Sequence, residues 1–196
     1  MPDEPFEVPA AAAAIASVDG AEIASAGLTD DGVPARVIHR RAARILLLDP
    51  QDRVLLSHDT WNGGHWWTTP GGGIEDGEDA RVAALREVAE ETGFRDVELG
   101  PVVIRHHWRA VFYDYMLDQH EWIFLGRTAG GEPDTSGLQG IEVEFMLGFR
   151  WWTAAELLAT TDTIYPAALP DVLAELLASG PPAVPVDDGE WALDEA

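Results

Sequence analysis

The residues of this chain best suited to chemistry are three glutamates in one predicted helix, Glu87, Glu90 and Glu91. At about 100° per residue, they fall within one sector of the helix. Mg²⁺ prefers oxygen ligands and binds proteins through a few carboxylates together with substrate phosphates. The spacing therefore predicts a divalent-metal site. The simpler alternative is a solvated helix face, because like charges so placed repel by only about 0.2–0.5 kcal/mol per pair.

The residues around these glutamates favour the metal site over a plain exposed face. Arg86 stands beside Glu87 and four residues before Glu90, where its guanidinium can orient a carboxylate. Glu78 precedes the helix closely enough to reach this arginine. The glycines at 71–73 let the backbone approach a ligand closely. We expect the glutamates to face solvent, while an apolar stripe packs on the far side of the helix: Val82, Leu85, Val88 and Ala89.

This region reproduces the Nudix box, G-x5-E-x7-R-E-U-x-E-E-x-G-U, in which U is a bulky apolar residue. The matching residues are Gly72, Glu78, Arg86, Glu87, Val88, Glu90, Glu91, Gly93 and Phe94. The chain therefore resembles the Nudix hydrolases. The resemblance implies an α/β fold in which a mixed β-sheet lies between helices, an α/β/α sandwich. It also implies hydrolysis of the pyrophosphate linkage of a nucleoside diphosphate joined to another moiety, a nucleotide or nucleotide-sugar substrate, with Mg²⁺ or Mn²⁺ as cofactor.

The same resemblance implies roles for individual residues of the box. Glu87, Glu90 and Glu91 would be metal ligands, together with the backbone carbonyl of Gly72. Either Glu90 or Glu91 would also activate the attacking water, and Arg86 would brace the carboxylates. The alternative is a Nudix-fold module that senses a nucleotide without cleaving it. Such modules usually lose box carboxylates, whereas this chain keeps all of them.

Residues outside the box are further candidates for binding the substrate. Arg44 and Arg53 could cradle phosphates, although the simpler account is that they offset local acidity. Trp67 could stack on a base or pack against the core. Nudix enzymes often recruit one more acid beyond the box, and here we favour Glu142. The other candidates for this role are the remaining acids beyond the box: Glu121, Glu132, Asp134 and Glu144.

The composition excludes several kinds of chemistry. The chain has no cysteine, which excludes disulfides, thiolate nucleophiles and cysteine zinc sites. All 12 basic residues are arginines, which excludes lysine Schiff bases and Walker-type phosphate loops. His106 and His107 lie at or just past the end of a predicted strand, where adjacent residues face opposite sides, so we expect no metal site from this pair. The net charge of −23 argues against a nucleic-acid partner, because binding the phosphate backbone needs clustered positive charge.

The hydrophobic pattern predicts one α/β domain. Strands are expected over 44–48 and 54–57, a helix over 79–92, and further strands over 97–104, 110–117 and 121–125. A capping box at 153–156 opens a helix that runs to about 160, and a last helix covers 172–178. We assign 36–180 to the domain, 1–35 to an acidic, weakly ordered extension and 181–196 to an acidic tail.

The sequence also carries expectations about location and partners. The alanine-rich run at 10–16 is far shorter than the about 20 apolar residues of a membrane span, and the acidic start does not resemble a targeting segment. We therefore expect a cytoplasmic protein that acts on a small nucleotide-type molecule, without a membrane partner. A homodimer is compatible with the sequence.

Overall fold

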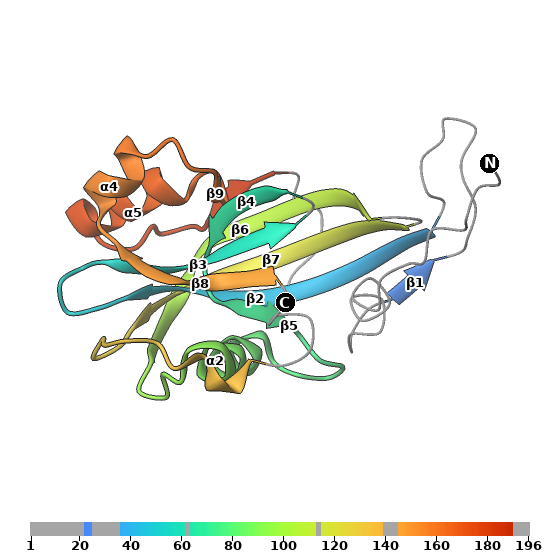
Figure 1. Ribbon diagram of the computed structural model, residues 1–196, viewed down its shortest axis with the longest axis horizontal. Helices are drawn as coiled ribbons and strands as arrows, with labels where there is room; N and C mark the ends of the chain where they lie inside the picture. Colours follow the sequence, from blue (N-terminus) through green and yellow to red (C-terminus); the bar gives the residue numbers. More distant parts are fainter. Residues whose placement is uncertain (1–21, 25–35, 62, 113–114, 139–144, 190–196) are drawn as a thin grey trace.

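A computed structural model describes residues 22–24, 36–61, 63–112, 115–138 and 145–189. Its strands are β1 (Glu22–Ala24), β2 (Arg36–Leu48), β3 (Val54–Trp61), β4 (Gly64–Thr68), β5 (Gly71–Gly73), β6 (Glu98–Phe112), β7 (Tyr115–Arg127), β8 (Met146–Trp152), β9 (Ile164–Tyr165) and β10 (Val186–Asp188). Its helices are α2 (Ala80–Thr92), α4 (Ala154–Ala159) and α5 (Leu169–Ser179), with a 3₁₀ turn, η1 (Thr135–Gly137). Figure 1 shows α2 on one side of the sheet, with α4 and α5 together on the other side.

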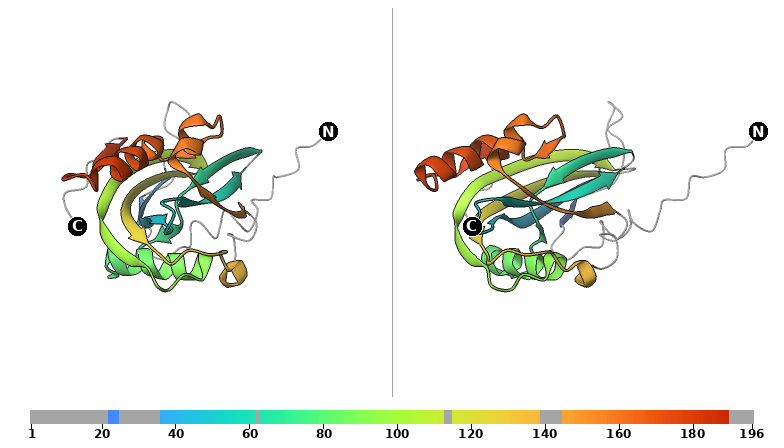
Figure 2. Two further views of the ribbon diagram at one scale, coloured as in Figure 1. Left: turned by 90° about the vertical axis from the view of Figure 1, so that its left-hand side faces the viewer. Right: turned by 60° about the vertical axis from the view of Figure 1, so that its left-hand side comes forward.

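The strands form one mixed sheet in the order β10-β6-β7-β2-β3-β4-β9, with β1 and β5 paired to β2 and β8 paired to β3. At its centre, β2 and β7 run parallel along their whole length, while β6 and β7 are antiparallel neighbours. The sheet curls strongly between the two groups of helices, as both views of Figure 2 show. The expected α/β class and mixed sheet are thus confirmed. No helix in the described part of the chain is long and apolar enough to span a bilayer.

The strands are longer than the sequence predicts, and one predicted strand is wrong. The expected strand over 110–117 straddles the end of β6 and the start of β7, and 113–114 lie outside the described residues. Polar residues such as His107 and Asp118 suggest strand ends in the sequence. They lie inside β6 and β7 because they pair with one another across the sheet. The predicted capping box is confirmed, since Thr153 and Glu156 each satisfy the other's backbone N–H at the start of α4.

Side chains from β2 enter two apolar clusters on opposite faces of the sheet. Leu46 and Leu48 pack with Leu169 and Leu173 of α5. The odd-numbered Ala43, Ile45 and Leu47 pack with Ala83, Ala84 and Val88 of α2. Strand residues alternate between faces, so residues 45–48 of β2 are buried on both sides of the sheet, and α2 packs on this part of the strand.

The predicted buried face of α2 is wrong in part. Val82 and Leu85 are 56% and 37% exposed, whereas Ala83, Ala84 and Val88 are fully buried. Two of the three candidate glutamates, Glu87 and Glu91, are also buried, at 8% and 6% exposure. The reason is the surface that the helix meets. The strand β5 consists of glycines, which leave room for carboxylates, and alanines let the helix approach the sheet closely.

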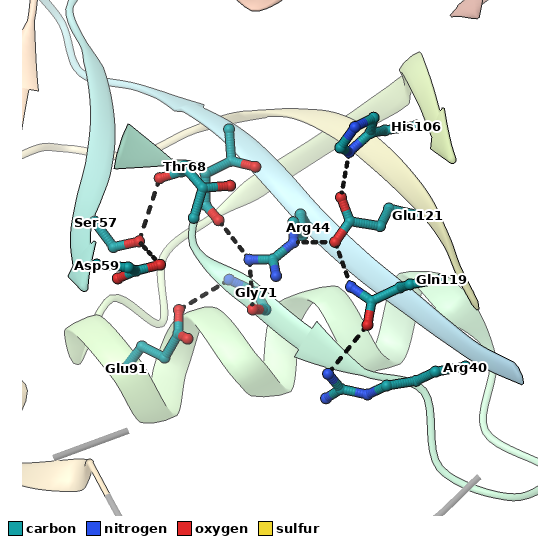
Figure 3. A network of polar contacts seen from close by, with 11 residues as sticks. Arg40, Arg44, Ser57, Asp59, Thr68, Gly71, Glu91, His106, Gln119 and Glu121 are labelled. Carbon is teal, nitrogen blue, oxygen red and sulfur yellow. Dashed lines mark hydrogen bonds and ion pairs between the residues drawn. The ribbon is translucent and has the colours of Figure 1, made fainter. Parts of the chain in front are cut away.

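A mostly buried arginine on β2, Arg44, holds the segment that leads into β5 (Figure 3). Arg44 donates from Nη1 to the carbonyls of Thr69 and Gly71 at 2.9 and 3.0 Å and from Nε to Glu121 Oε1 at 2.8 Å. The other Glu121 oxygen lies 2.8 Å from His106 Nδ1. Gly71 has φ +136, and a Cβ there would overlap the β2 backbone, so this close approach requires glycine. The strand β5 is therefore fixed to the interior of the sheet.

Charge pairing outweighs the cost of burial within this network. Burial alone would raise the pKa of Glu121, but the adjacent Arg44 and His106 hold it well below its ordinary value. For Arg44, burial opposes the charge, yet Glu121 raises the pKa above its ordinary value. Both groups are thus charged in the folded protein, and each depends on the other.

Truncating two neighbouring residues of α2 tests which face is buried. Val88→Ala should lower the free energy of unfolding by about 2 kcal/mol, since it removes buried methyl groups and leaves a cavity. Leu85→Ala, the larger truncation, should cost less than about 1 kcal/mol because this side chain is partly solvated. Urea denaturation measures both values. A larger loss of stability in Leu85→Ala than in Val88→Ala would show that the predicted apolar stripe, and not the observed face, is buried.

Replacing the buried carboxylate tests the Arg44 network. Glu121→Gln should lower the free energy of unfolding by about 3–5 kcal/mol at about pH 7, because it leaves a buried guanidinium unpaired. The control is Asp52→Asn in the exposed pair with Arg127, which should cost at most about 1 kcal/mol.

The same variant has a defined pH dependence. The folded-state pKa of Glu121 lies below its ordinary value of 4.5, so the unfolded chain binds more protons in this range. The stabilisation is present above the ordinary pKa and is lost as the pH falls toward the folded pKa. The stability gap between wild type and Glu121→Gln should therefore shrink from about pH 7 to about pH 3.5. A stability difference that stays constant over this pH range would show that Glu121 is not charged in the folded protein.

Candidate active site

Arg86 of α2 lies at the centre of a cluster of carboxylates. Its Nε and Nη2 donate to the two oxygens of Glu78 at 2.9 and 2.8 Å. Its Nη1 donates to Glu87 Oε1 at 2.8 Å and lies 3.4 Å from Glu90 Oε2. The Nη2 group also donates to the carbonyl of Gly73 at 3.0 Å. One guanidinium thus joins the segment before the helix, the helix itself and the glycine strand.

Local sequence explains how α2 presents these side chains. Asp79 caps the helix by accepting from the backbone of Arg81 at 2.8 Å, which places Glu78 one residue outside the first turn. Gly93 ends the helix in the left-handed conformation, with φ 75. Between the two caps, helical spacing places Arg86, Glu87 and Glu90 on neighbouring positions of the surface.

The fourth carboxylate is held from the strand side. Glu91 Oε2 accepts from the backbone N–H of Gly71 at 2.8 Å, and Gly71 is in turn held by Arg44 (Figure 3). The expectation of a fully solvent-facing glutamate surface is therefore wrong. Glu87 and Glu91 point toward the glycine strand, whereas the side chain of Glu90 is 52% exposed. The carboxylates line the junction between α2 and β5.

This cluster has more negative than positive charge. Glu78, Glu87, Glu90 and Glu91 contribute −4 and Arg86 contributes +1, which leaves −3. Hydrogen bonding to Arg86 holds the pKa of Glu78 below its ordinary value, and pairing with Glu78 raises the pKa of Arg86. Such an excess of carboxylate oxygens suits a hard divalent cation.

Gly72 leaves room for the carboxylate of Glu87 beside the backbone of β5. A Cβ at position 72 would overlap the carboxylate of Glu87, so the backbone of β5 lies directly against a box glutamate. Carboxylate and carbonyl oxygens are the donors that Mg²⁺ and Mn²⁺ prefer. The donor set at the α2–β5 junction therefore fits the cofactor that the sequence predicts.

The candidate substrate residues outside the box have other contacts. Arg44 supports the backbone of the glycine segment, as described above. Arg53 donates to Asp49 at 2.7 Å in the turn between β2 and β3. The Trp67 ring stacks on His58 at 4.3 Å and meets Trp152 edge-on at 5.0 Å. Trp67 thus takes part in packing, while Glu142 lies outside the described residues.

Sequence reasoning missed the partnership of Arg44 with Glu121. Both were candidates, one for phosphate binding and one for the further acid, but nothing in the sequence joined them. They are 77 positions apart and meet only through the parallel register of β2 and β7. The signal available was weak, because β2 and β7 each carry several charged or polar residues besides Arg44 and Glu121.

Comparisons with known protein sequences point to the same family as the Nudix box does. A family model described as NUDIX domain matches residues 38–172. An RNA pyrophosphohydrolase of Roseobacter denitrificans is 37% identical over 99 residues, which cover 50% of this chain and 60% of that protein. An RNA pyrophosphohydrolase of Dinoroseobacter shibae is 30% identical over 156 residues, which cover 71% of this chain and 89% of that protein.

A solved structure supports the fold. A Nudix hydrolase from Nitrosomonas europaea is 21% identical, has a TM-score of 0.51 and covers 72% of this chain and 90% of its own. At this identity the likeness concerns the fold alone. The family match spans more than half of the chain and includes the whole carboxylate cluster. This chain belongs to the Nudix hydrolase family.

Proposed function

We propose that this protein hydrolyses the pyrophosphate linkage of a nucleoside diphosphate derivative with the help of Mg²⁺ or Mn²⁺. The observation that carries the proposal is the excess of carboxylates around Arg86, held against the glycine backbone of β5. In this proposal Glu87, Glu90 and Glu91 hold the metal, together with the carbonyl of Gly72. When bound, the ion supplies Lewis-acid chemistry, neutralising phosphate charge and polarising the phosphoryl group.

The chain's own residues position and deprotonate the nucleophile. Arg86 keeps Glu87 and Glu90 oriented despite their mutual repulsion, since it contacts both. Glu90 or Glu91 takes a proton from the attacking water while the water oxygen forms a bond to phosphorus. The bridging P–O bond then breaks, and the departing phosphate oxygen takes the electron pair. The hydrogen bond from Gly71 N–H orients Glu91, while Glu90 is the more solvated of the two.

We propose a small nucleotide-type substrate. The two relatives described above are named RNA pyrophosphohydrolases, so the triphosphorylated end of an RNA is the natural competitor. The net charge of −23 favours the smaller molecule. The phosphodiester backbone of an RNA is itself negatively charged, and the protein would repel it wherever it extends beyond the bound metal. A non-cleaving sensor is disfavoured by the complete set of carboxylates.

A substrate panel tests this proposal. The purified protein should release nucleoside monophosphate or inorganic phosphate from one or more members of a panel that holds nucleoside triphosphates, nucleotide sugars and a 5′-triphosphorylated RNA. Turnover should require Mg²⁺ or Mn²⁺ and stop with a chelator. Cleavage of the RNA alone would contradict the small-molecule assignment. Binding without cleavage of every compound would support the sensor instead.

Removing a single box carboxylate tests the metal ligands. Glu90→Gln should reduce kcat/KM by at least about tenfold, the effect seen when groups around a metal are removed. Because Glu90 is half-exposed, its replacement should leave the melting temperature nearly unchanged. The matched control is Glu98→Gln, the same change at an exposed acid of β6 outside the box. Equal activity of both variants would rule out Glu90 as a ligand.

Adding one methyl group tests the role of Gly72. Gly72→Ala should place a Cβ on the Glu87 carboxylate and raise the Mg²⁺ concentration needed for half-maximal activity by about tenfold. The control is Gly100→Ala in β6, where the nearest atom to a Cβ would be the carbonyl oxygen of Leu125 at 3.3 Å. An unchanged Mg²⁺ requirement in Gly72→Ala would contradict a metal site at the α2–β5 junction.

A further inference from the structure

A second cluster of metal-ligand residues lies away from the Nudix box. His107 of β6 and Asp118 and His120 of β7 bring their ligand atoms within 4.8 Å of one another. His107 Nε2 lies 2.6 Å from Asp118 Oδ1, and His120 Nδ1 lies 4.0 Å from the same oxygen. The two imidazole rings stack at 4.0 Å. These three side chains are called the His–Asp–His cluster below.

The strand register explains why the cluster forms. His107 and His120 are directly opposite each other in the β6–β7 pair, and Asp118 is two residues before His120 on the same face of β7. The sequence argument excluded a site from His106 and His107, and these two do face different partners, Glu121 and Asp118. The ligand pair comes instead from opposite strands, which the sequence could not reveal.

Burial separates the cluster from an ordinary surface group of polar residues. The side chains of His107, Asp118 and His120 are 5%, 6% and 11% exposed. Three polar groups with ligand chemistry are thus held on rigid strands and largely removed from water. Strands hold ligands more firmly than loops do, which favours a defined coordination geometry.

The charges around the cluster leave one carboxylate oxygen facing the imidazoles. Asp118 Oδ2 accepts from Arg109 Nε at 3.1 Å and lies 3.4 Å from His39 Nδ1. Asp118 Oδ1 faces His107 and His120.

We propose that the His–Asp–His cluster is a second metal site, specific for a transition-metal ion of the Zn²⁺ class. Two imidazoles and one carboxylate form a ligand set typical of Zn²⁺, whereas Mg²⁺ prefers oxygen ligands alone. Zinc bonds of about 2.0–2.2 Å place tetrahedral ligand atoms roughly 3.3 Å apart. The two imidazoles, which stack with an interplanar angle of 10°, would have to rotate out of this stack so that a nitrogen of each points at the ion. The ion would replace the hydrogen bond between His107 and Asp118, and would link β6 to β7.

The experiment measures Zn²⁺ binding to the full chain while Mg²⁺ occupies the box. Metal-free protein is titrated with Zn²⁺ in a large excess of Mg²⁺, by calorimetry and by metal analysis after gel filtration. We expect one retained zinc per chain in the wild type and in Glu90→Gln. His120→Asn and His107→Gln should bind zinc at least tenfold more weakly, while the control His65→Asn, at an exposed histidine of β4, should match the wild type. Loss of the retained zinc in Glu90→Gln, or its persistence in His120→Asn, would overturn the proposal.

A spectroscopic measurement on the wild type tests the proposal even if the variants at the buried positions His107 and His120 do not fold. Co²⁺ is added to the wild type in excess Mg²⁺, and its visible d–d absorption is recorded. A site with imidazole ligands and four-coordinate geometry should give the intense bands of tetrahedral Co²⁺. The weak bands of six-coordinate Co²⁺, or no bound cobalt, would overturn the proposal without any substitution.

Discussion

A single guanidinium holds the carboxylates of the Nudix box in place. Arg86 lies within ion-pair distance of Glu78, Glu87 and Glu90, which would otherwise repel one another and separate. It also donates to the Gly73 carbonyl, so the same side chain ties α2 to β5. Arg86 neutralises this charge only in part, and the remaining negative charge at the α2–β5 junction is what the proposed divalent cation would balance. Most other features near the site keep these two elements in contact.

The glycine strand is fixed from the opposite direction by Arg44. This buried arginine joins the Thr69 and Gly71 carbonyls to Glu121, and Gly71 in turn donates to Glu91. A continuous chain of hydrogen bonds therefore runs from the interior of the sheet to a box glutamate. Strand alternation keeps this network apart from the His–Asp–His cluster, because Glu121 and Asp118 extend from opposite faces of β7. One strand can thus support two separate groups of ionisable residues.

The distribution of positive charge bears on the proposed role of a metal ion. The chain has no lysine, and several of its arginines are already paired with carboxylates. These pairs include Arg44–Glu121, Arg53–Asp49, Arg105–Asp187, Arg127–Asp52 and Arg150–Glu156. An arginine paired in this way has little charge left for a phosphate. A bound divalent cation would supply the positive charge that these side chains do not.

The sequence by itself determined the local features: the box glutamates, the Arg86–Glu78 pairing and the helix caps, because these depend on residues close together in the chain. The tertiary structure alone decided which face of α2 is buried, since burial depends on the glycine surface of β5 and not on helical periodicity. It also decided the pairing of Arg44 with Glu121 and of His107 with His120. These contacts follow from strand register, which is set by pairing between distant segments, and no local pattern of residues encodes that register.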